Sequence, residues 1–292
     1  MKVCILANSH AHALRLAAQE RTPKWRPVFF AAPANRMRRI RLTGGRLVAR
    51  DAGVARWMDR TSGGVREVVL RDYDAFVICG LSLRALDGLR MFCDHQPVGR
   101  RVSDDVALVS EAAFRAAVRD RIQASAGARL MQLLKDRKPV LIVPAPMPSV
   151  RIAELPEFDW INRPGGAEAV RWISGIVLEE IRALADERGF RFMPQPPETL
   201  DERGLTRLEY AEDAVRFTGS AYSEDDISHM NTAYGALILH SIGGALGWRA
   251  ALPHRWDHRL QVAARRLRKF RRRCLSLIQG DRRPETPAVR TA

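Results

Sequence analysis

The sequence predicts an α/β fold of three layers (α/β/α), in which a mostly parallel five-stranded sheet lies between two layers of helices. Three observations support this prediction. Short, continuously apolar runs recur along the chain, and such runs are typical of strands that are buried on both faces. Amphipathic helical patterns alternate with the runs. The runs end at polar, Gly-containing or Pro-containing segments, where the ligands of a parallel sheet usually bind.

The five expected strands share this apolar composition and are bounded by polar residues. They cover residues 3–7, 27–32, 75–79, 139–143 and 190–193. Helical spacing of apolar residues predicts helices in the segments between and after them. These helices cover residues 10–20, a mainly helical region at about 103–135, and residues 167–187 and 233–246. Residues 39–42 and 46–49 alternate around Gly44 and Gly45, which predicts a surface hairpin.

The chain length and charge distribution predict one domain with an appendage. A chain of 292 residues with 46% apolar residues buries a large core. We expect the α/β domain to cover residues 1–250, a basic amphipathic helix residues 251–279, and a disordered tail residues 280–292. Residues 251–292 hold 12 Lys and Arg against 3 Asp and Glu, so +9 of the net charge of +15 belongs to this part and +6 to the rest. The basic excess is therefore mainly a property of the tail.

The basic helix has three interpretations from the sequence. In the first, it packs on its own domain or on a second subunit. In the second, it lies on an anionic membrane surface through residues 254–278, and in the third it binds a polyanion. Sequence-specific nucleic-acid binding is not expected, because no nucleic-acid-binding motif accompanies the charge. The oligomeric state is not predicted. His254 and His258 are four residues apart, but two histidines without a third ligand are best explained as surface residues.

Other bulk features exclude several classes of protein. The four cysteines are widely scattered, which argues against a disulfide framework and a zinc site, so we expect no metal and no cofactor. No apolar run reaches the roughly 18 residues that a membrane helix needs, and the N-terminus lacks the pattern of a signal peptide. We therefore expect a cytoplasmic protein, with peripheral membrane association as the alternative for the basic helix.

The candidate catalytic residues are Ser9, Asp226 and His229. Ser9 follows the first strand and precedes a helix, so it lies at a junction with outward-pointing N–H groups. A serine hydroxyl becomes a nucleophile when an imidazole accepts its proton and a carboxylate orients that imidazole. Asp226 and His229 are three residues apart, a spacing that allows the carboxylate to contact one ring nitrogen while the other faces the serine. The structural alternatives are that Ser9 caps its helix, and that Asp225 or Asp226 caps the helix at 231–246.

These residues resemble two sequence blocks of the SGNH or GDSL hydrolase family. The first block of that family is a strand followed by Gly-Asp-Ser with the nucleophile, and residues 7–10 (Ala-Asn-Ser-His) stand in its place. The last block is Asp-x-x-His, often followed by Asn, and residues 226–231 match it. The strand that ends at residues 80–82 is similar to the block that usually contains Gly-x-Asn. The resemblance spans about residues 1–246 and implies a flavodoxin-like fold.

The expected oxyanion and substrate-binding residues are Gly80, Ser82 and Asn35. In the family, an Asn side chain, the N–H of the serine and the N–H of a glycine stabilise the oxyanion. Here Ser82 replaces that Asn, and no glycine is clearly placed after the second strand. Asn35 follows the second strand and offers a side-chain donor. Losing one such donor typically lowers turnover about a hundredfold or more.

The sequence therefore predicts a serine esterase or O-acyltransferase. The family resemblance implies an O-acyl ester as substrate, a small molecule or an acetylated carbohydrate. The alternative is a weakly active or inactive member of the same fold that serves as a binding or assembly module at an anionic membrane or glycan surface.

Overall fold

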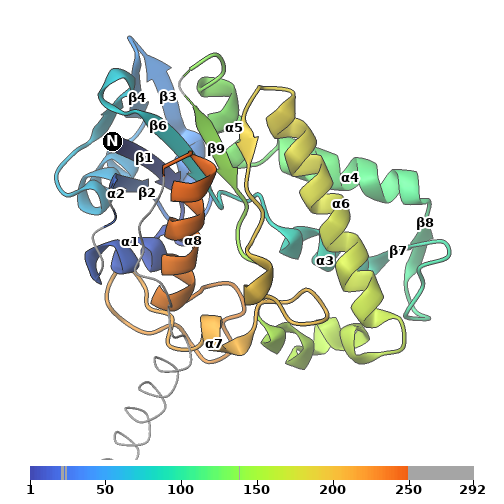
Figure 1. Cartoon of the computed structure of the whole chain (residues 1–292). Helices are drawn as coiled ribbons and strands as arrows, with labels where there is room; N and C mark the ends of the chain where they lie inside the picture. The colour runs from blue at the N-terminus through green and yellow to red at the C-terminus, as the bar shows by residue number, and fades with distance from the viewer. Residues whose placement is uncertain (21–22, 24, 138, 249–292) are drawn as a thin grey trace, which may run out of the picture. The chain divides into compact units, whose positions relative to one another are not determined.

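The computed structural model describes residues 1–20, 23, 25–137 and 139–248 (Figure 1). A five-stranded sheet forms its centre, with β1 (Lys2–Ala7), β2 (Arg26–Ala31), β6 (Ala75–Cys79), β9 (Val140–Val143) and β10 (Arg191–Phe192). The strand order is β10-β9-β6-β1-β2, and every neighbouring pair is parallel. This is the order of flavodoxin-like folds. The predicted fold class is confirmed, and each expected strand lies within one residue of its predicted bounds.

Both faces of the sheet are buried, which explains the unbroken apolar runs. Cys4 and Leu6 belong to a core cluster shared with β2, β6 and β9 and with the helices of one face. These helices are α2 (Ala52–Ser62), α3 (Ala85–Asp94), α4 (Glu111–Gln123), α5 (Ala126–Leu133) and α6 (Gly166–Asp186). Val3 and Ile5 alternate with Cys4 and Leu6, point to the opposite face and are fully buried as well. There α1 (Ala11–Glu20) and α8 (Thr232–Ala245) pack side by side (Figure 1).

Smaller elements complete the fold. The predicted hairpin is present as β3 (Ile40–Thr43) and β4 (Arg46–Ala49), and Gly44 and Gly45 both have the positive φ that a tight two-residue turn requires. A third strand, β5 (Glu67–Val69), pairs with β4. Short strands β7 (His95–Pro97) and β8 (Ala107–Val109) form a separate parallel pair. The remaining elements are the helix α7 (Leu208–Ala211) and the 3-10 helices at Arg36–Arg39, Leu70–Asp72, Val150–Glu154, Pro156–Asn162 and Pro197–Thr199.

The mainly helical region expected at about residues 103–135 holds α4 and α5, but the helices differ from the prediction in two details. The helical region expected from about residue 103 contains a strand first, because α4 begins only after Ser110, whose side chain accepts a hydrogen bond from Ala113 N–H. Helix α3 was not predicted, since Gly88 interrupts its apolar pattern. A Cβ on Gly88 would lie 2.9 Å from Ile173 Cγ2, so close packing of α3 against α6 requires this glycine.

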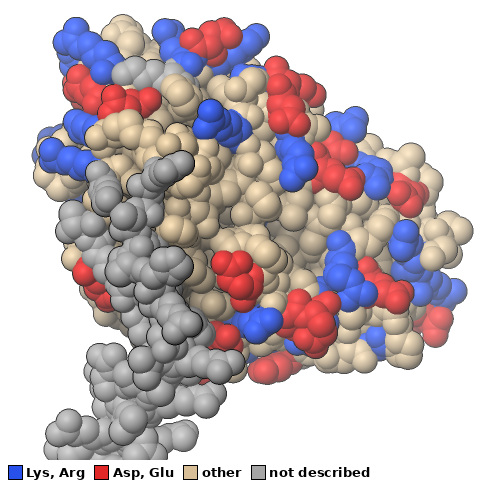
Figure 2. Space-filling view, in the orientation of Figure 1, with Lys and Arg blue, Asp and Glu red and all other residues tan. Residues whose placement is uncertain are grey.

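Figure 2 shows one face of the molecule, on which Lys and Arg lie interspersed with Asp and Glu. Much of the basic excess belongs to residues 251–292, outside the described part of the chain. The predicted basic helix at 251–279, its membrane-facing segment 254–278, the tail 280–292, and His254 and His258 therefore stay predictions. Within residues 1–20, 23, 25–137 and 139–248, no helix is both long and apolar enough to cross a membrane.

Candidate active site

Ser9 lies where the connections of the sheet change direction. The chain leaves β1 for β2 on one side and later returns to β6 on the other, so the carboxyl ends of β1 and β6 flank a topological switch point. Ligands of open parallel sheets bind at this point. Ser9 follows β1 by two residues, and its backbone N–H donates a hydrogen bond to no other described residue. The backbone therefore presents both the hydroxyl and a free N–H at this edge.

The structure brings Ser9, His229 and Asp226 into one hydrogen-bonded chain. Ser9 Oγ lies 2.9 Å from His229 Nε2. His229 Nδ1 lies 2.9 Å from Asp226 Oδ2 and 3.1 Å from Asp226 Oδ1. The Asp226 and His229 side chains are 20% and 19% exposed, so the pair is largely withdrawn from water but still accessible. This is the arrangement in which an imidazole accepts a serine proton while a carboxylate stabilises the resulting cation.

The Asp226 carboxylate has two roles in the loop before α8. Its Oδ1 accepts hydrogen bonds from the backbone N–H groups of Ser228 (2.9 Å) and His229 (2.8 Å), which fixes the turn that presents the imidazole. Burial raises the pKa of this carboxyl, but the hydrogen bonds from the His229 ring and from the two backbone N–H groups outweigh burial and leave the pKa below its usual value. Asp226 therefore stays ionised beside His229 at neutral pH.

Contacts from the segment after β9 hold this loop in place. The backbone N–H of Ser149, which is fully buried, donates to Ile227 O at 2.8 Å. Arg151 donates to Glu224 O through Nη1, and its Nη2 lies 3.8 Å from Glu212 Oε1. The position of His229 therefore depends on a loop more than 70 residues earlier in the chain.

The predicted oxyanion residues Asn35 and Ser82 meet across the end of β1. Asn35 follows β2 and Ser82 follows β6, the two strands on either side of β1. Ser82 Oγ donates to Asn35 Oδ1 at 2.5 Å. A hydroxyl has one proton, and this bond uses the proton of Ser82. Of these two side chains, therefore, only the NH₂ group of Asn35 can donate to a ligand.

Gly80 contributes space at the site and has no N–H left to donate to a ligand. Its N–H donates to Val143 O at 2.9 Å and is thus engaged in the sheet. A Cβ at this position would lie 2.8 Å from Asn8 Oδ1 and 2.9 Å from a ring carbon of His10, and its φ is +72°. Leu81 and Ser82 also have positive φ, an uncommon conformation for residues with side chains. This left-handed turn directs Ser82 toward Asn35.

The capping alternatives do not describe this structure. The Ser9 carbonyl accepts from His12 N–H at 3.1 Å, while its hydroxyl contacts His229. The cap of α8 is Asn231, whose Oδ1 accepts from Ala233 N–H (2.9 Å) and Tyr234 N–H (3.2 Å). Neither Asp225 nor Asp226 caps that helix.

Two aromatic rings stack on His229, and sequence reasoning missed one of them, Tyr222. The Tyr222 ring lies 3.8 Å from the His229 ring between centroids, with 9° between the planes, and the His10 ring lies at 5.3 Å and 26°. Burial, followed by the neighbouring His229 and Arg84, lowers the pKa of His10 to about 3, so this ring stays neutral. His10 adjoins Ser9 in the sequence, which predicts that it flanks the site. Tyr222 lies in a loop without hydrophobic periodicity and gives no sequence signal.

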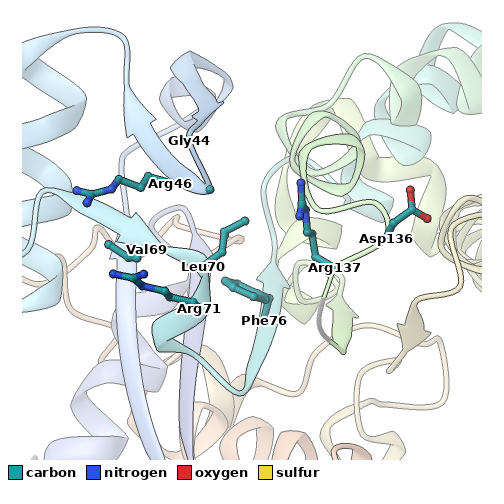
Figure 3. A pocket seen from close by; sticks show the side chains of 9 residues that line it. Gly44, Arg46, Val69, Leu70, Arg71, Phe76, Asp136 and Arg137 are labelled. Carbon is teal, nitrogen blue, oxygen red and sulfur yellow. The ribbon is translucent and has the colours of Figure 1, made fainter.

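No cluster of three or more His, Cys, Asp or Glu side chains suited to a metal ion occurs among the described residues. A cavity of about 480 Å³ lies elsewhere, at the amino ends of the strands (Figure 3). Leu70 and Phe76 contribute to its lining, and Arg137 lies across from them. The guanidinium groups of Arg46 and Arg71 point away from Phe76 and Arg137. This cavity is at the opposite edge of the sheet from Ser9.

Comparisons with known proteins give a likeness in fold. No profile of a known protein family matches the chain, and no curated protein matches it. A solved structure from Slackia heliotrinireducens, assigned provisionally as an SGNH hydrolase, is 14% identical, covers 82% of this chain and 97% of its own, and has a TM-score of 0.35. An extracellular lipase from Streptomyces rimosus is 14% identical. The match covers 82% of this chain and 99% of the lipase, with a TM-score of 0.42.

The chain has a flavodoxin-like α/β fold. The strand order and direction described above confirm this part of the sequence prediction. The fold assignment rests on this strand order, and the likenesses to the two solved structures add no argument to it.

Proposed function

We propose that this chain is a serine esterase or O-acyltransferase that acts on O-acyl esters, with acetylated carbohydrates as the first substrate class to test. Ser9 is the nucleophile, His229 the general base and acid, and Asp226 the group that orients His229. The observation that carries the proposal is the hydrogen-bonded path from Ser9 Oγ to His229 Nε2 (2.9 Å) and from His229 Nδ1 to Asp226 Oδ2 (2.9 Å).

The chemistry follows from this path. Ser9 Oγ attacks the ester carbonyl carbon while its proton passes to His229 Nε2, and the carbonyl oxygen becomes an oxyanion. When the ester C–O bond breaks, His229 gives the proton to the leaving alcohol, and the acyl group remains on Ser9. Water or an acceptor alcohol then attacks the acyl carbon while its proton passes to His229 Nε2. The bond between the acyl carbon and Ser9 Oγ breaks, His229 returns the proton to Ser9 Oγ, and the acid or the new ester leaves. The Asp226 carboxylate stabilises the imidazolium in both steps without accepting the proton.

Two donors are proposed for the oxyanion. The Ser9 backbone N–H has no acceptor in the described part of the chain, so it is available. The Asn35 NH₂ group is the second, because Ser82 engages the Asn35 carbonyl oxygen. In this proposal Ser82 orients Asn35 instead of contacting the oxyanion itself. The family's Asn donor is thus replaced by an Asn from a different strand end.

Labelling with a fluorophosphonate tests the proposal, because this probe reacts with activated serines. We expect one adduct on the intact protein and none on Ser9→Ala. The matched control is Ser241→Ala, a serine in α8 whose hydroxyl donates to Leu237 O, which should label like the wild type. An adduct that persists on Ser9→Ala would refute the assignment of the nucleophile. Turnover of p-nitrophenyl acetate and of acetylated oligosaccharides, measured with and without an added alcohol, then compares water with alcohols as acceptors.

A folded protein that shows neither labelling nor ester turnover would favour the second candidate, a non-catalytic binding module. The replacement of the family's Asn donor by Ser82 is the feature that keeps this candidate open. Circular dichroism on the same samples establishes that the protein is folded.

A further inference from the structure

The loop at residues 214–222 folds as a short antiparallel turn beside the candidate active site. Val215 and Ala221 form an antiparallel bridge, and Tyr222 N–H donates to Ala214 O at 3.0 Å. The turn closes at Gly219, whose φ is +88°. Its own backbone hydrogen bonds therefore define this loop, which we call the tyrosine loop.

Contacts with α1 and α2 anchor the tip of the tyrosine loop. The Phe217 ring lies 4.6 Å from the His12 ring and 6.2 Å from the Trp57 ring between centroids. Arg60 Nη2 donates to Phe217 O at 3.4 Å. Since α1 begins two residues after Ser9, the loop contacts the helix that follows the candidate nucleophile.

At the end of this loop, Tyr222 covers one face of the His229 imidazole. The near-parallel planes and the 3.8 Å separation indicate full stacking. His10 also stacks on His229, with 5.3 Å between the ring centroids. The guanidinium of Arg216 lies 4.9 Å from the centroid of the Tyr222 ring. Rotation of the His229 ring away from Ser9 would therefore require Tyr222 or His10 to move.

The Tyr222 side chain also interacts with the side chain of Ser9, and this interaction affects the pKa of the phenol. Burial, followed by the charge of Asp226, raises the pKa of Tyr222 to about 12, against smaller opposing effects of Arg216 and of an interaction with the Ser9 side chain. The phenol is thus protonated at neutral pH and can donate to Ser9 Oγ. A donor at Ser9 Oγ leaves the serine's own proton directed at His229 Nε2.

We propose that Tyr222 is a positioning residue for acyl transfer: its ring holds the His229 imidazole in the plane that faces Ser9, and its hydroxyl orients the Ser9 hydroxyl. This inference rests on the proposed function, which it deepens by adding a residue from outside the blocks that resemble the SGNH family. The ring and the hydroxyl act on different atoms, so two substitutions separate them. Tyr222→Phe keeps the ring, and Tyr222→Leu removes both.

The test measures the rate of fluorophosphonate labelling from pH 5 to pH 9 on the full chain, with the folded fraction followed by circular dichroism. We expect Tyr222→Phe to label about threefold to tenfold more slowly with an unchanged pH midpoint. Tyr222→Leu should label about 30-fold to 100-fold more slowly, because misplacement of a catalytic group by about 1 Å costs up to about a hundredfold. Its pH midpoint should also shift. The matched control, Thr218→Ala at the exposed tip of the loop, should behave like the wild type.

Two outcomes would overturn the inference. One is wild-type labelling by Tyr222→Leu. The other is a slower rate that is fully accounted for by a smaller folded fraction and leaves the pH midpoint unchanged, which would make Tyr222 merely structural.

A second readout does not depend on activity. The Tyr222 ring current should displace the His229 ring-proton resonances in the wild type and in Tyr222→Phe, and this displacement should be lost in Tyr222→Leu. If the wild type fails to label, the proposed function fails, but the resonances still test whether Tyr222 stacks on His229. His229 signals that are the same in all three proteins would refute the stacking.

Discussion

Replacing Gly235 by alanine should destabilise the protein and slow its reaction, because α1 and α8 meet at this residue without room for a side chain. A Cβ on Gly235 would lie 2.2 Å from Ala13 O and 2.7 Å from Leu14 N. Both are backbone atoms of α1, so no side-chain rotation relieves the overlap. The two helices must separate by about 1 Å or more to restore ordinary contact distances of about 3.5–4 Å.

The size of the effect follows from two opposing contributions. Overpacking of a core typically costs about 1–3 kcal/mol, and an overlap with fixed backbone belongs at the upper end of this range. Alanine is about 1 kcal/mol more favourable than glycine inside a helix. The net loss in the free energy of unfolding is therefore about 2 kcal/mol, which lowers the melting temperature of a domain of this size by about 4–8 °C.

The assay compares urea unfolding, followed by circular dichroism, with the rate of fluorophosphonate labelling. Ser9 precedes α1 and His229 precedes α8, so separation of these helices should slow labelling of the folded protein about tenfold or more. Gly244→Ala is the matched control, because it lies in the same helix, is exposed, and its Cβ would meet no atom within 4 Å. It should gain about 0.5–1 kcal/mol and label normally. A Gly235→Ala protein at least as stable as the wild type would refute the packing argument.

Two further predictions concern the loops that hold the site. The pKa of Asp226 is lowered in the folded state, so its stabilising contribution is present above the unfolded value of about 3.9 and is lost as the pH falls through the folded value. Asp226→Asn should thus be less stable than the wild type at pH 7 by urea unfolding, and the difference should shrink below about pH 4; a difference that is constant with pH would contradict this. Thr206 is fully buried, and its Oγ1 donates to Met147 O (2.6 Å) and accepts from Gln195 Nε2 (3.0 Å). Thr206→Val leaves Met147 O unpaired, while Gln195 Nε2 keeps its hydrogen bond to Thr199 Oγ1 (2.8 Å), and the substitution should cost about 1–3 kcal/mol in the same assay. The exposed Thr218→Val should change stability by less than about 0.5 kcal/mol. Equal effects of the two would exclude a role for the buried hydrogen bonds.

Much of the fold was predictable because burial on both faces leaves a local signature. The run at residues 75–79 contains only apolar residues, and the structure places it in the centre of the sheet as β6. Helix α3 was not predicted, because Gly88 interrupts its helical pattern. This glycine is required by close packing against Ile173, which lies 85 residues away in the sequence. Local patterns report burial, but they do not report which partner a residue packs against.

The sequence by itself determined the strands, the hairpin at Gly44 and Gly45, and the pairing of Asp226 with His229, because each depends on residues close together in the chain. Only the tertiary structure decided which residues surround them. It brought Ser82 to Asn35 across the end of β1 and placed Tyr222 on the His229 ring. These contacts form between irregular loops without hydrophobic periodicity, whose positions are set by hydrogen bonds and packing with segments far away in the sequence.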